Sequence, residues 1–220
     1  MESMVTDPLT DPDRSLGRRE RKKIETRTAL HHAAIELFAR NGFRNTRISE
    51  IADAADVSES TFFRYFDSKE GVALEGIRQR AEALVAAVRA RPIEESPIDA
   101  CLAVNQDAGR LQLRLEEDDL PGLEFLRETP ELASKAHLIL RRTVAQLAEE
   151  FARRLEQDVS SLEVRLQTHV VISASIAALE VWIADPTASD PQQLSQQALT
   201  RLRDGLSAAP QLSDAVRRRH

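Results

Sequence analysis

The stretch RISEIADAADVSESTFFRYFDSK, Arg47–Lys69, has the pattern of two short helices joined by a tight turn. Apolar residues recur every three or four positions until Asp56 and Val57 interrupt them, and Ser58 can then cap a second helix through its hydroxyl. Six of the nine aromatic residues of the chain lie within Phe38–Phe66. Such a compact helical unit with an aromatic core is typical of a helix that is held against DNA.

The second helix of this unit has two different faces. Phe62 and Phe66 lie four residues apart, so they point together into a small core. The opposite face carries side chains that can reach a duplex, since an arginine can fork onto guanine and a tyrosine can donate to a phosphate oxygen. The candidates on this face are Ser60, Thr61, Phe63, Arg64 and Tyr65.

Three further candidates flank this helix. Thr46 and Arg47 open the first helix of the unit, where donors commonly meet the DNA backbone, and Lys69 adds a positive charge after the second helix. The alternative for the whole unit is a packed helical hairpin with an aromatic core and no contact with nucleic acid.

The composition of the 220-residue chain favours helices. Ala, Leu, Arg and Glu are abundant, and there are only seven glycines. The best candidate for a strand, Val170–Ser175, lies inside a longer apolar pattern of helical character. Cys101 is the single cysteine, which excludes an intrachain disulfide and a cysteine-rich metal site and predicts a buried thiol. The expected fold class is all-α.

Positive charge is concentrated near one end of an otherwise acidic chain. Residues 14–70 carry 12 Lys and Arg against 9 Asp and Glu, whereas residues 71–220 carry 18 against 23. A basic run, Arg18–Lys23, leads into the first expected helix. This distribution suits nucleic-acid binding at one end of the molecule. A solvated helix end is the alternative interpretation of the basic run.

Periodicity and helix breakers predict the remaining organisation. A first helix is expected over residues 18–41, ended by Gly42, and a long helix over residues 68–91, ended by Pro92. Further helices are expected over residues 98–117, 122–128, 131–157, 160–184 and 192–208. We therefore expect a disordered tail (residues 1–17), a three-helix helix-turn-helix DNA-binding head (18–67), a larger helical ligand-binding and dimerisation domain (68–210) and a second tail (211–220).

The longer stretch FARNGFRNTRISEIADAADVSESTFFRYFDSKEGV, residues 38–72, resembles the N-terminal signature of TetR-type transcriptional regulators. The turn, the helix after it and the following Ser-Lys-Glu agree with that signature in spacing, and the resemblance extends over about residues 20–75. It implies an all-helical homodimer in which each head places its third helix in a major groove of double-stranded DNA, at a palindromic operator. It also implies a larger C-terminal domain that dimerises and binds a small effector.

The resemblance also assigns roles by position. Thr46, Arg47 and Ser49 belong to the DNA-facing start of the second helix, Lys69 contacts phosphate, and the five candidates of the third helix belong to the recognition helix. Two residues depart from the family pattern: Asp56 stands where the turn usually has Gly, and Arg47 stands where Thr is usual. Asp tolerates a left-handed backbone better than most residues, so the turn is expected to form. Arg47 puts a simple capping role in doubt and adds a charge that attracts phosphate.

Residues 160–184 are apolar on nearly every side, which requires burial on two sides. One side can face its own domain and the other a second copy of the chain, because small Ser and Ala residues let another helix approach closely. The candidate residues of the dimer interface are Ile176, Leu179, Ile183 and Leu199. A helix buried centrally in a monomer is the alternative.

Two segments, GLEFLRETPELASKAHLILRR (Gly122–Arg142) and AALEVWIADP (Ala177–Pro186), resemble the ligand domains of TetR-type regulators of mycofactocin systems. The resemblance implies an acyl-CoA-like effector, with an apolar tunnel for the acyl chain and basic groups for the phosphates. The candidates for the charged end are Arg114, Arg127, Arg141 and Arg142, and those for the wall are Leu126, Leu140, Val144, Ile172 and Trp182.

Nothing in the sequence indicates catalysis. There is no GxSxG, HExxH or phosphate-binding loop, and neither a metal nor another cofactor is expected. His137 and His169 fall on neighbouring expected helices, where they could form a metal pair or supply a general base. Histidines satisfied in or near the core are the favoured interpretation.

The location and the function are predicted together. The acidic N-terminus has no apolar segment of a signal peptide, and the apolar run Val170–Ala184 is short and contains Glu180, so we expect a cytoplasmic protein with no membrane span.

The sequence predicts a dimeric, ligand-responsive, DNA-binding transcription factor, a repressor by family habit. A helical binding or scaffold protein that does not touch DNA is the alternative.

Overall fold

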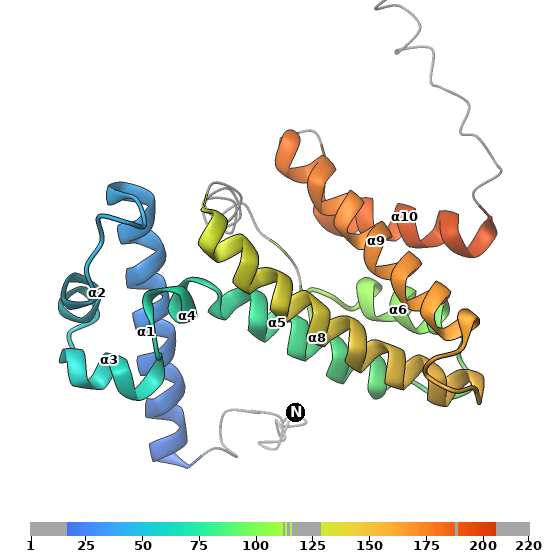
Figure 1. The fold of residues 1–220 in the computed structure, drawn as a ribbon, viewed down its shortest axis with the longest axis horizontal. Coiled ribbons are helices and arrows are strands. Elements are labelled where there is room, and N and C mark those ends of the chain that lie inside the picture. The colour runs from blue at the N-terminus through green and yellow to red at the C-terminus, as the bar shows by residue number, and fades with distance from the viewer. Residues whose placement is uncertain (1–16, 112, 114, 116–128, 188, 206–220) are drawn as a thin grey trace, which may run out of the picture. The chain divides into compact units, whose positions relative to one another are not determined.

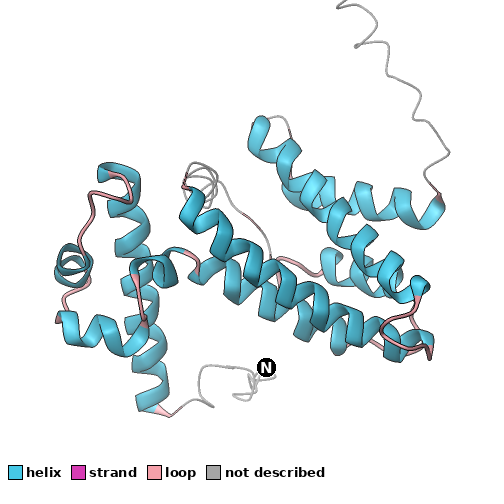
Figure 2. Ribbon diagram, in the orientation of Figure 1, coloured by secondary structure: helices cyan, strands magenta, loops and turns pink. Residues whose placement is uncertain are grey.

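The computed structural model describes residues 17–111, 113, 115, 129–187 and 189–205 (Figure 1). Figure 2 shows that every element of regular structure in these ranges is helical, which confirms the all-α fold class. The helices are α1 (Arg18–Asn41), α2 (Ile48–Ala54), α3 (Glu59–Tyr65), α4 (Lys69–Ala73), α5 (Glu75–Arg89), α6 (Pro97–Gln106), α8 (Pro130–Leu155), α9 (Leu162–Ala184) and α10 (Pro191–Asp204).

The chain forms two compact units that divide between Gly76 and Ile77. We call the first unit the head and the second the body. The head contains α1 to α4, and the body contains α6 and α8 to α10. The division lies beyond residue 67, the expected end of the DNA-binding domain, because α4 packs against α1 and so belongs to the head. α5 begins in the head with Glu75 and continues into the body.

The head is organised around α1. Leu30, Ala34 and Phe38 form a buried stripe along this helix, as the apolar spacing predicts. Phe38 and Phe43 meet edge to face, with ring centroids 5.1 Å apart. Ile51 of α2 is also fully buried, so a small aromatic and aliphatic core supports the short helices.

The turn between α2 and α3 has the local structure that its sequence predicts. Asp56 has a left-handed backbone with a φ of 52°, in the place where the family usually has Gly. The Oγ of Ser58 accepts a hydrogen bond from the backbone N–H of Thr61 at 3.2 Å, so Ser58 caps α3. Gly42 follows α1 with a φ of 78°, a conformation that favours glycine over other residues.

The long helix expected over residues 68–91 is instead broken at Leu74 into α4 and α5. Leu74 and Glu75 are both buried at this break. Glu75 is buried through an ion pair with Arg27 of α1. An interaction between residues so far apart in the sequence leaves no trace in local periodicity, so the break could not be predicted from it.

The other helix boundaries differ less from expectation. The helix expected over residues 98–117 ends at Gln106, and the chain then turns through Asp107 and Gly109. α8 begins with Pro130 in its first turn, and Ser161 caps α9 through its hydroxyl. The helix expected over residues 122–128 lies outside the described residues.

Helices α8 and α9 form the centre of the body, together with α5, α6 and α10. The residues at its buried core include Val88, Leu147, Phe151, Val164 and Leu199. α6 is tied to α10 by Asn105, whose side-chain amide donates to the Oε1 of Gln196 at 2.9 Å. These contacts build an apolar interior with a hydrogen-bonded edge.

α9 is long and apolar enough to cross a bilayer by length and composition alone, a test that core helices of soluble proteins also pass. Val164, Ile172 and Trp182 of α9 lie in the interior of the body. One side of α9 therefore packs in the body, while other apolar side chains of the same helix are exposed.

Candidate DNA-binding surface and effector cavity

α3 has one face inside the head and one face open to solvent. Phe62 is 0% exposed and Phe66 is 3% exposed, and their ring centroids lie 5.8 Å apart. On the other side Phe63 is 51% exposed, and Ser60 and Arg64 are also exposed. The two predicted faces of the helix are therefore present, and the outer one is accessible to a duplex.

Side chains at both ends of α3 are held in place by contacts with neighbouring side chains. At its start, the Oγ of Ser58 lies 2.8 Å from the Oγ of Ser60 and 3.0 Å from the Oγ1 of Thr61. At its end, the guanidinium of Arg64 lies 5.2 Å from the centroid of the Tyr65 ring. Thr61 and Tyr65 are half-buried. Because these contacts restrict the side chains before binding, less conformational entropy is lost when DNA is engaged.

The start of α2 supplies further polar groups. Arg47 is the N-cap residue and is exposed, and Ser49 is half-buried. The backbone N–H of Arg47 donates to the Oε2 of Glu50 at 2.7 Å, whereas the Arg47 side chain makes no capping hydrogen bond. The positive charge of Arg47 therefore stays at the surface, where it can attract phosphate.

Two members of the predicted DNA-facing set, Thr46 and Lys69, make contacts within the head. Thr46 is 1% exposed, and its hydroxyl donates to the carbonyl of Gly42 at 2.9 Å. The Nζ of Lys69 donates to the carbonyls of Phe43 and Thr46 at 2.5 and 2.8 Å, and it lies 4.5 Å from the centroid of the Phe43 ring. Lys69 thus ties the start of α4 to the loop before α2, a long-range role that residue type does not reveal.

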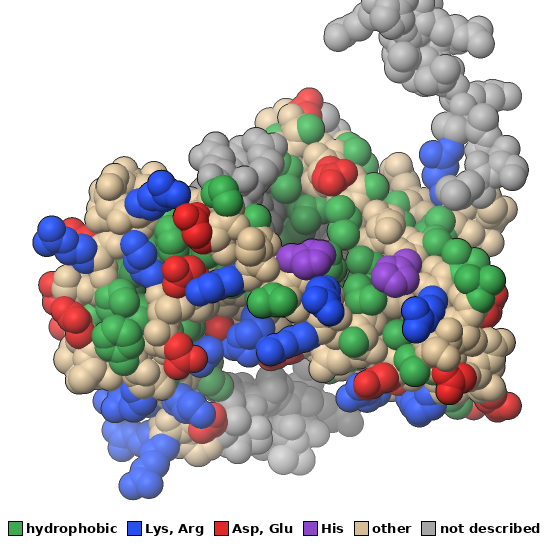
Figure 3. Space-filling view, in the orientation of Figure 1, with side chains coloured by type: hydrophobic (Ala, Val, Ile, Leu, Met, Phe, Trp, Pro, Cys, Tyr) green, Lys and Arg blue, Asp and Glu red, His purple; other side chains and the backbone are tan. Residues whose placement is uncertain are grey.

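The basic run Arg18–Lys23 forms the first turns of α1, and its side chains are exposed. Figure 3 shows Lys and Arg side chains gathered over this end of the helix. A surface ion pair between Lys23 and Glu20, at 3.4 Å, contributes little to stability. The excess positive charge suits the neutralisation of phosphates near the head.

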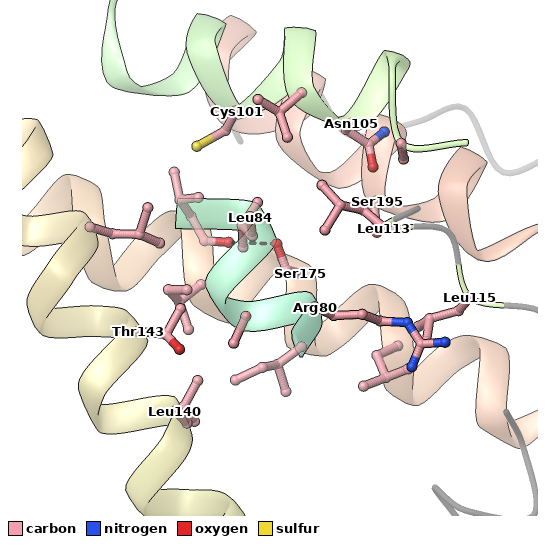
Figure 4. Close-up of a pocket in the computed structure, with 18 of the residues that line it drawn as sticks. Arg80, Leu84, Cys101, Asn105, Leu113, Leu115, Leu140, Thr143, Ser175 and Ser195 are labelled. Atoms are coloured by element: carbon pink, nitrogen blue, oxygen red, sulfur yellow. Dashed lines mark hydrogen bonds between the residues drawn. The ribbon is translucent and has the colours of Figure 1, made fainter. Parts of the chain in front are cut away.

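A cavity of about 330 Å³ lies inside the body, between α5, α6, α8, α9 and α10 (Figure 4). Its size is at the lower end of the range for small-molecule sites. Most side chains of the wall are aliphatic, and none of the described lining residues is aromatic. A wall of this kind favours a flexible aliphatic ligand over a planar one that needs stacking.

Three polar side chains of the wall form hydrogen bonds within the protein. Thr143 and Ser175 donate to the carbonyls four residues earlier in their own helices, at 3.0 and 3.1 Å. Asn105 is used in its bond with Gln196. These groups therefore add little hydrogen-bonding capacity to the cavity, which offers chiefly shape and apolar surface.

Two of the predicted ligand-binding residues, Leu140 and Ile172, line the cavity. Arg80 of α5 also lines it, and it is the charged member of the described lining. Figure 4 shows Arg80 and Leu115 on one side of the drawn wall, away from Leu140. The arginines predicted for the charged end all lie within residues 114–142, and Arg80 is not among them. Apolar residues recur every three or four positions around Arg80, and this spacing is the sequence signal that could have indicated that Arg80 lies beside an apolar interior.

The other ligand-binding candidates within the described residues do not line the cavity. Val144 packs against the core without lining the cavity, and Trp182 is 1% exposed in another part of the interior. Arg141 and Arg142 are exposed on α8, because they follow Leu140 around the helix toward solvent. The candidates outside the described residues are Arg114, Leu126 and Arg127.

Most of the residues that were predicted for a dimer interface line the cavity of the body. Ile176, Leu179 and Leu199 line the cavity, and Ile183 is half-buried. The large apolar side chains that α9 does expose are Leu162, Leu166 and Val181, which are 81%, 52% and 54% exposed. Because α9 is apolar all round, its sequence cannot show which side faces its own body.

The structure also places the two histidines and the cysteine that the sequence singled out. His137 and His169 are exposed rather than satisfied in the core, and no group of three potential metal ligands occurs in the described part of the chain. Cys101 is buried as predicted, and burial raises the pKa of its thiol to about 12. The thiol is therefore protonated at neutral pH and is a poor nucleophile.

Comparison with known proteins covers both units. Residues 30–75 match the family described as "Bacterial regulatory proteins, tetR family", and residues 100–207 match the "MftR C-terminal domain". The chain is similar to the HTH-type transcriptional regulator TcmR of Streptomyces glaucescens, with 36% identity over 157 residues that cover 63% of this chain and 69% of that protein.

Two solved structures have a similar fold. The fatty acid degradation regulator FadR from Bacillus halodurans superposes with a TM-score of 0.59 and 21% identity, over 83% of this chain and 96% of that one. FadR of Thermus thermophilus, a TetR-family transcriptional repressor in complex with lauroyl-CoA, superposes with a TM-score of 0.55 and 26% identity, over 85% and 98% of the two chains.

Helix-turn-helix proteins read the major groove with a short helix that follows a tight turn, and α3 has this arrangement, with one face buried and the other exposed. The chain is a transcriptional regulator of this class. It belongs to the TetR family. Its relatives are named transcriptional regulators, which confirms the prediction that the protein is not an enzyme.

Proposed function

We propose that the protein is a dimeric repressor that leaves a palindromic operator when an aliphatic amphiphile, of the acyl-CoA type, enters the cavity of the body. The observation that carries the proposal is the position of α5 in the chain. This helix begins in the head and contributes Ile77, Arg80, Ala81 and Leu84 to the cavity wall. A ligand that moves the wall therefore acts on the helix that continues into the head.

The ligand class follows from the chemistry of the wall. Aliphatic side chains and internally bonded hydroxyls favour an acyl chain, and Arg80 is placed to attract an anionic or phosphate-bearing end. The T. thermophilus FadR complex with lauroyl-CoA supports an acyl thioester as the first compound to test.

A second copy of the chain is proposed to bind the outward face of α9. Leu162, Leu166 and Val181 are exposed there, and large exposed apolar side chains along one helix favour a partner. In such a dimer the two recognition helices must lie about 34–36 Å apart to enter successive major grooves. An effector shifts the protein away from that spacing only through its different affinity for the two states. The regulator is proposed to act in the cytoplasm, where bacterial DNA lies.

Arg64→Ala is expected to weaken operator binding by about 1–3 kcal/mol, because Arg64 is the exposed cation of the recognition helix. The measurement is fluorescence anisotropy with a duplex from the promoter beside its own gene, over a range of salt concentrations. If Arg64 contacts a phosphate, the salt slope also falls by about one.

Arg110→Ala is the matched control, since it removes the same charge from the body, where Arg110 is 78% exposed. Equal losses for the two variants would mean that only net charge matters and would remove Arg64 from the interface. Absence of binding to any promoter duplex by the unaltered protein would support the scaffold alternative.

Lauroyl-CoA is expected to raise the melting temperature and to release the operator over the same concentration range. Saturation at about 100 times the Kd stabilises the folded state by about 2.7 kcal/mol. Leu140→Gln should abolish most of this stabilisation, because it buries an amide in the apolar wall. Leu138→Gln on the same helix is the control, since Leu138 is 55% exposed. The effector proposal fails if none of the acyl-CoA compounds tested, whatever their chain length, shifts the melting temperature.

A further inference from the structure

One guanidinium in the head contacts both the end of the recognition helix and the start of α5. The Nε and Nη2 of Arg27 donate to the two carboxylate oxygens of Glu75 at 2.5 and 2.8 Å. Its Nη1 donates to the carbonyl of Tyr65 at 3.2 Å, and the guanidinium lies 4.7 Å from the centroid of the Phe66 ring. Tyr65 is the last residue of α3, and Glu75 is the first residue of α5.

The contacts of Arg27 are specific to arginine. The planar fork binds a carboxylate with two parallel hydrogen bonds, and it still has an N–H for the carbonyl at the negative end of α3. A lysine in this place could keep one charge contact, but it has no planar fork to bind both partners and stack on a ring. The Glu75 side chain is only 2% exposed, so the loss of Arg27 would remove an ion-pair partner from a buried carboxylate.

The same helix that begins with Glu75 lines the cavity. α5 is uninterrupted from Glu75 to Arg89, and Ile77, Arg80, Ala81 and Leu84 are part of the cavity wall. The rise of 1.5 Å per residue separates Glu75 from Ile77 by about 3 Å and from Arg80 by about 7.5 Å along the helix axis. Over so short a length a helix moves as a rigid element, so a displacement of the wall also displaces Glu75.

We infer that the Arg27–Glu75 ion pair is the joint through which the occupied cavity acts on the recognition helix. Arg27 is a positioning residue. It fixes the position of the end of α3 through its contacts with Tyr65 and Phe66, and Glu75 fixes the position of the Arg27 guanidinium. This inference rests on the proposed function, and it adds that the effector changes the orientation of α3 within each head as well as the distance between heads. The coupling that passes through such a joint is about 5- to 150-fold in operator affinity.

A test without any effector uses the full-length chain and a bulky residue in the cavity. Ala81→Phe places a ring in the cavity from α5. In the otherwise unaltered protein, this substitution should lower operator affinity at least fivefold. In the Arg27→Lys background, Ala81→Phe should lower operator affinity less than twofold further, because the joint is already broken. Equal factors in the two backgrounds, or no effect of Ala81→Phe in the first, would overturn the inference. Arg78→Lys is the control background, since Arg78 pairs with Glu82 on the surface of α5, and the full effect should persist there.

A second arm uses lauroyl-CoA. Arg27→Lys should bind lauroyl-CoA with unchanged affinity by calorimetry, while the ratio of operator affinities without and with lauroyl-CoA falls toward one. Glu75→Gln should repeat this result, and it serves in place of Arg27→Lys if that variant proves unfolded by circular dichroism. If lauroyl-CoA lowers the operator affinity of both variants by the same factor as that of the unaltered protein, the inference that the ion pair is the joint is wrong. If the unaltered protein does not bind lauroyl-CoA while the Ala81→Phe effect still depends on Arg27, the proposed effector is wrong and the joint stands.

Discussion

Arg154→Ala is expected to destabilise the body by about 3–5 kcal/mol, because it removes the buried partner of a buried carboxylate. The side chains of Arg154 and Glu150 are 0% and 1% exposed, and the Nε of Arg154 lies 2.9 Å from the Oε1 of Glu150. This contact is a charge contact without the alignment of a hydrogen bond. The Nη1 and Nη2 atoms of Arg154 donate to carbonyls in the last turn of α5 and in the segment that follows it, including those of Val88 and Pro92 at 2.7 and 2.6 Å.

The loss should be larger than that of a simple surface pair for two reasons. Glu150 would remain buried with less compensation, and the carbonyls at the end of α5 and just after it would each lose one of their donors. Trp182 is the only tryptophan of the chain and is buried in the body, so its fluorescence during urea unfolding reports the stability of this unit.

Arg153 offers a control of the same residue type against the same carboxylate. It lies 2.8 Å from the Oε2 of Glu150, but its side chain is 56% exposed. Arg153→Ala should therefore cost no more than about 1 kcal/mol. Similar losses for the two variants would show that the burial of Arg154 does not determine its contribution.

Phe62→Ala is expected to destabilise the head by about 3–5 kcal/mol and to abolish operator binding, because the fully buried ring leaves a cavity under the recognition helix. Hydrogen exchange of the amides in α1 to α4 measures the stability of the head. The unfolding transition reported by Trp182 should stay in place, since the head and the body are separate compact units. A shift of that transition by the same free energy would mean that the two units unfold together.

Phe63→Ala separates the support of the recognition helix from its contact with DNA. Phe63 adjoins Phe62 in sequence and is 51% exposed, so its loss should change stability by less than about 1 kcal/mol. Weaker operator binding by a head of unchanged stability would place Phe63 on the DNA-facing surface. A loss of stability as large as that of Phe62→Ala would show that the exposed ring also supports the fold.

The head could be predicted in detail because its signals are local. The spacing of Phe62 and Phe66, the capping hydroxyl of Ser58 and the left-handed Asp56 all act within a few residues, and the structure has each of them where the pattern indicated. The all-α class and most helix starts follow from the same kind of short-range information, such as Pro130 in the first turn of α8.

The tertiary structure decided what depends on partners far along the chain. Thr46 and Lys69 have the residue types of DNA contacts, yet carbonyls brought near by folding occupy their donors. The two sides of α9 are equally apolar, so only packing against the other helices determined that Ile176 faces the cavity. Arg27 and Glu75 are 48 positions apart, and their ion pair could be known only from the folded chain. Periodicity and capping are properties of neighbouring residues, whereas burial and pairing across such separations arise when helices pack.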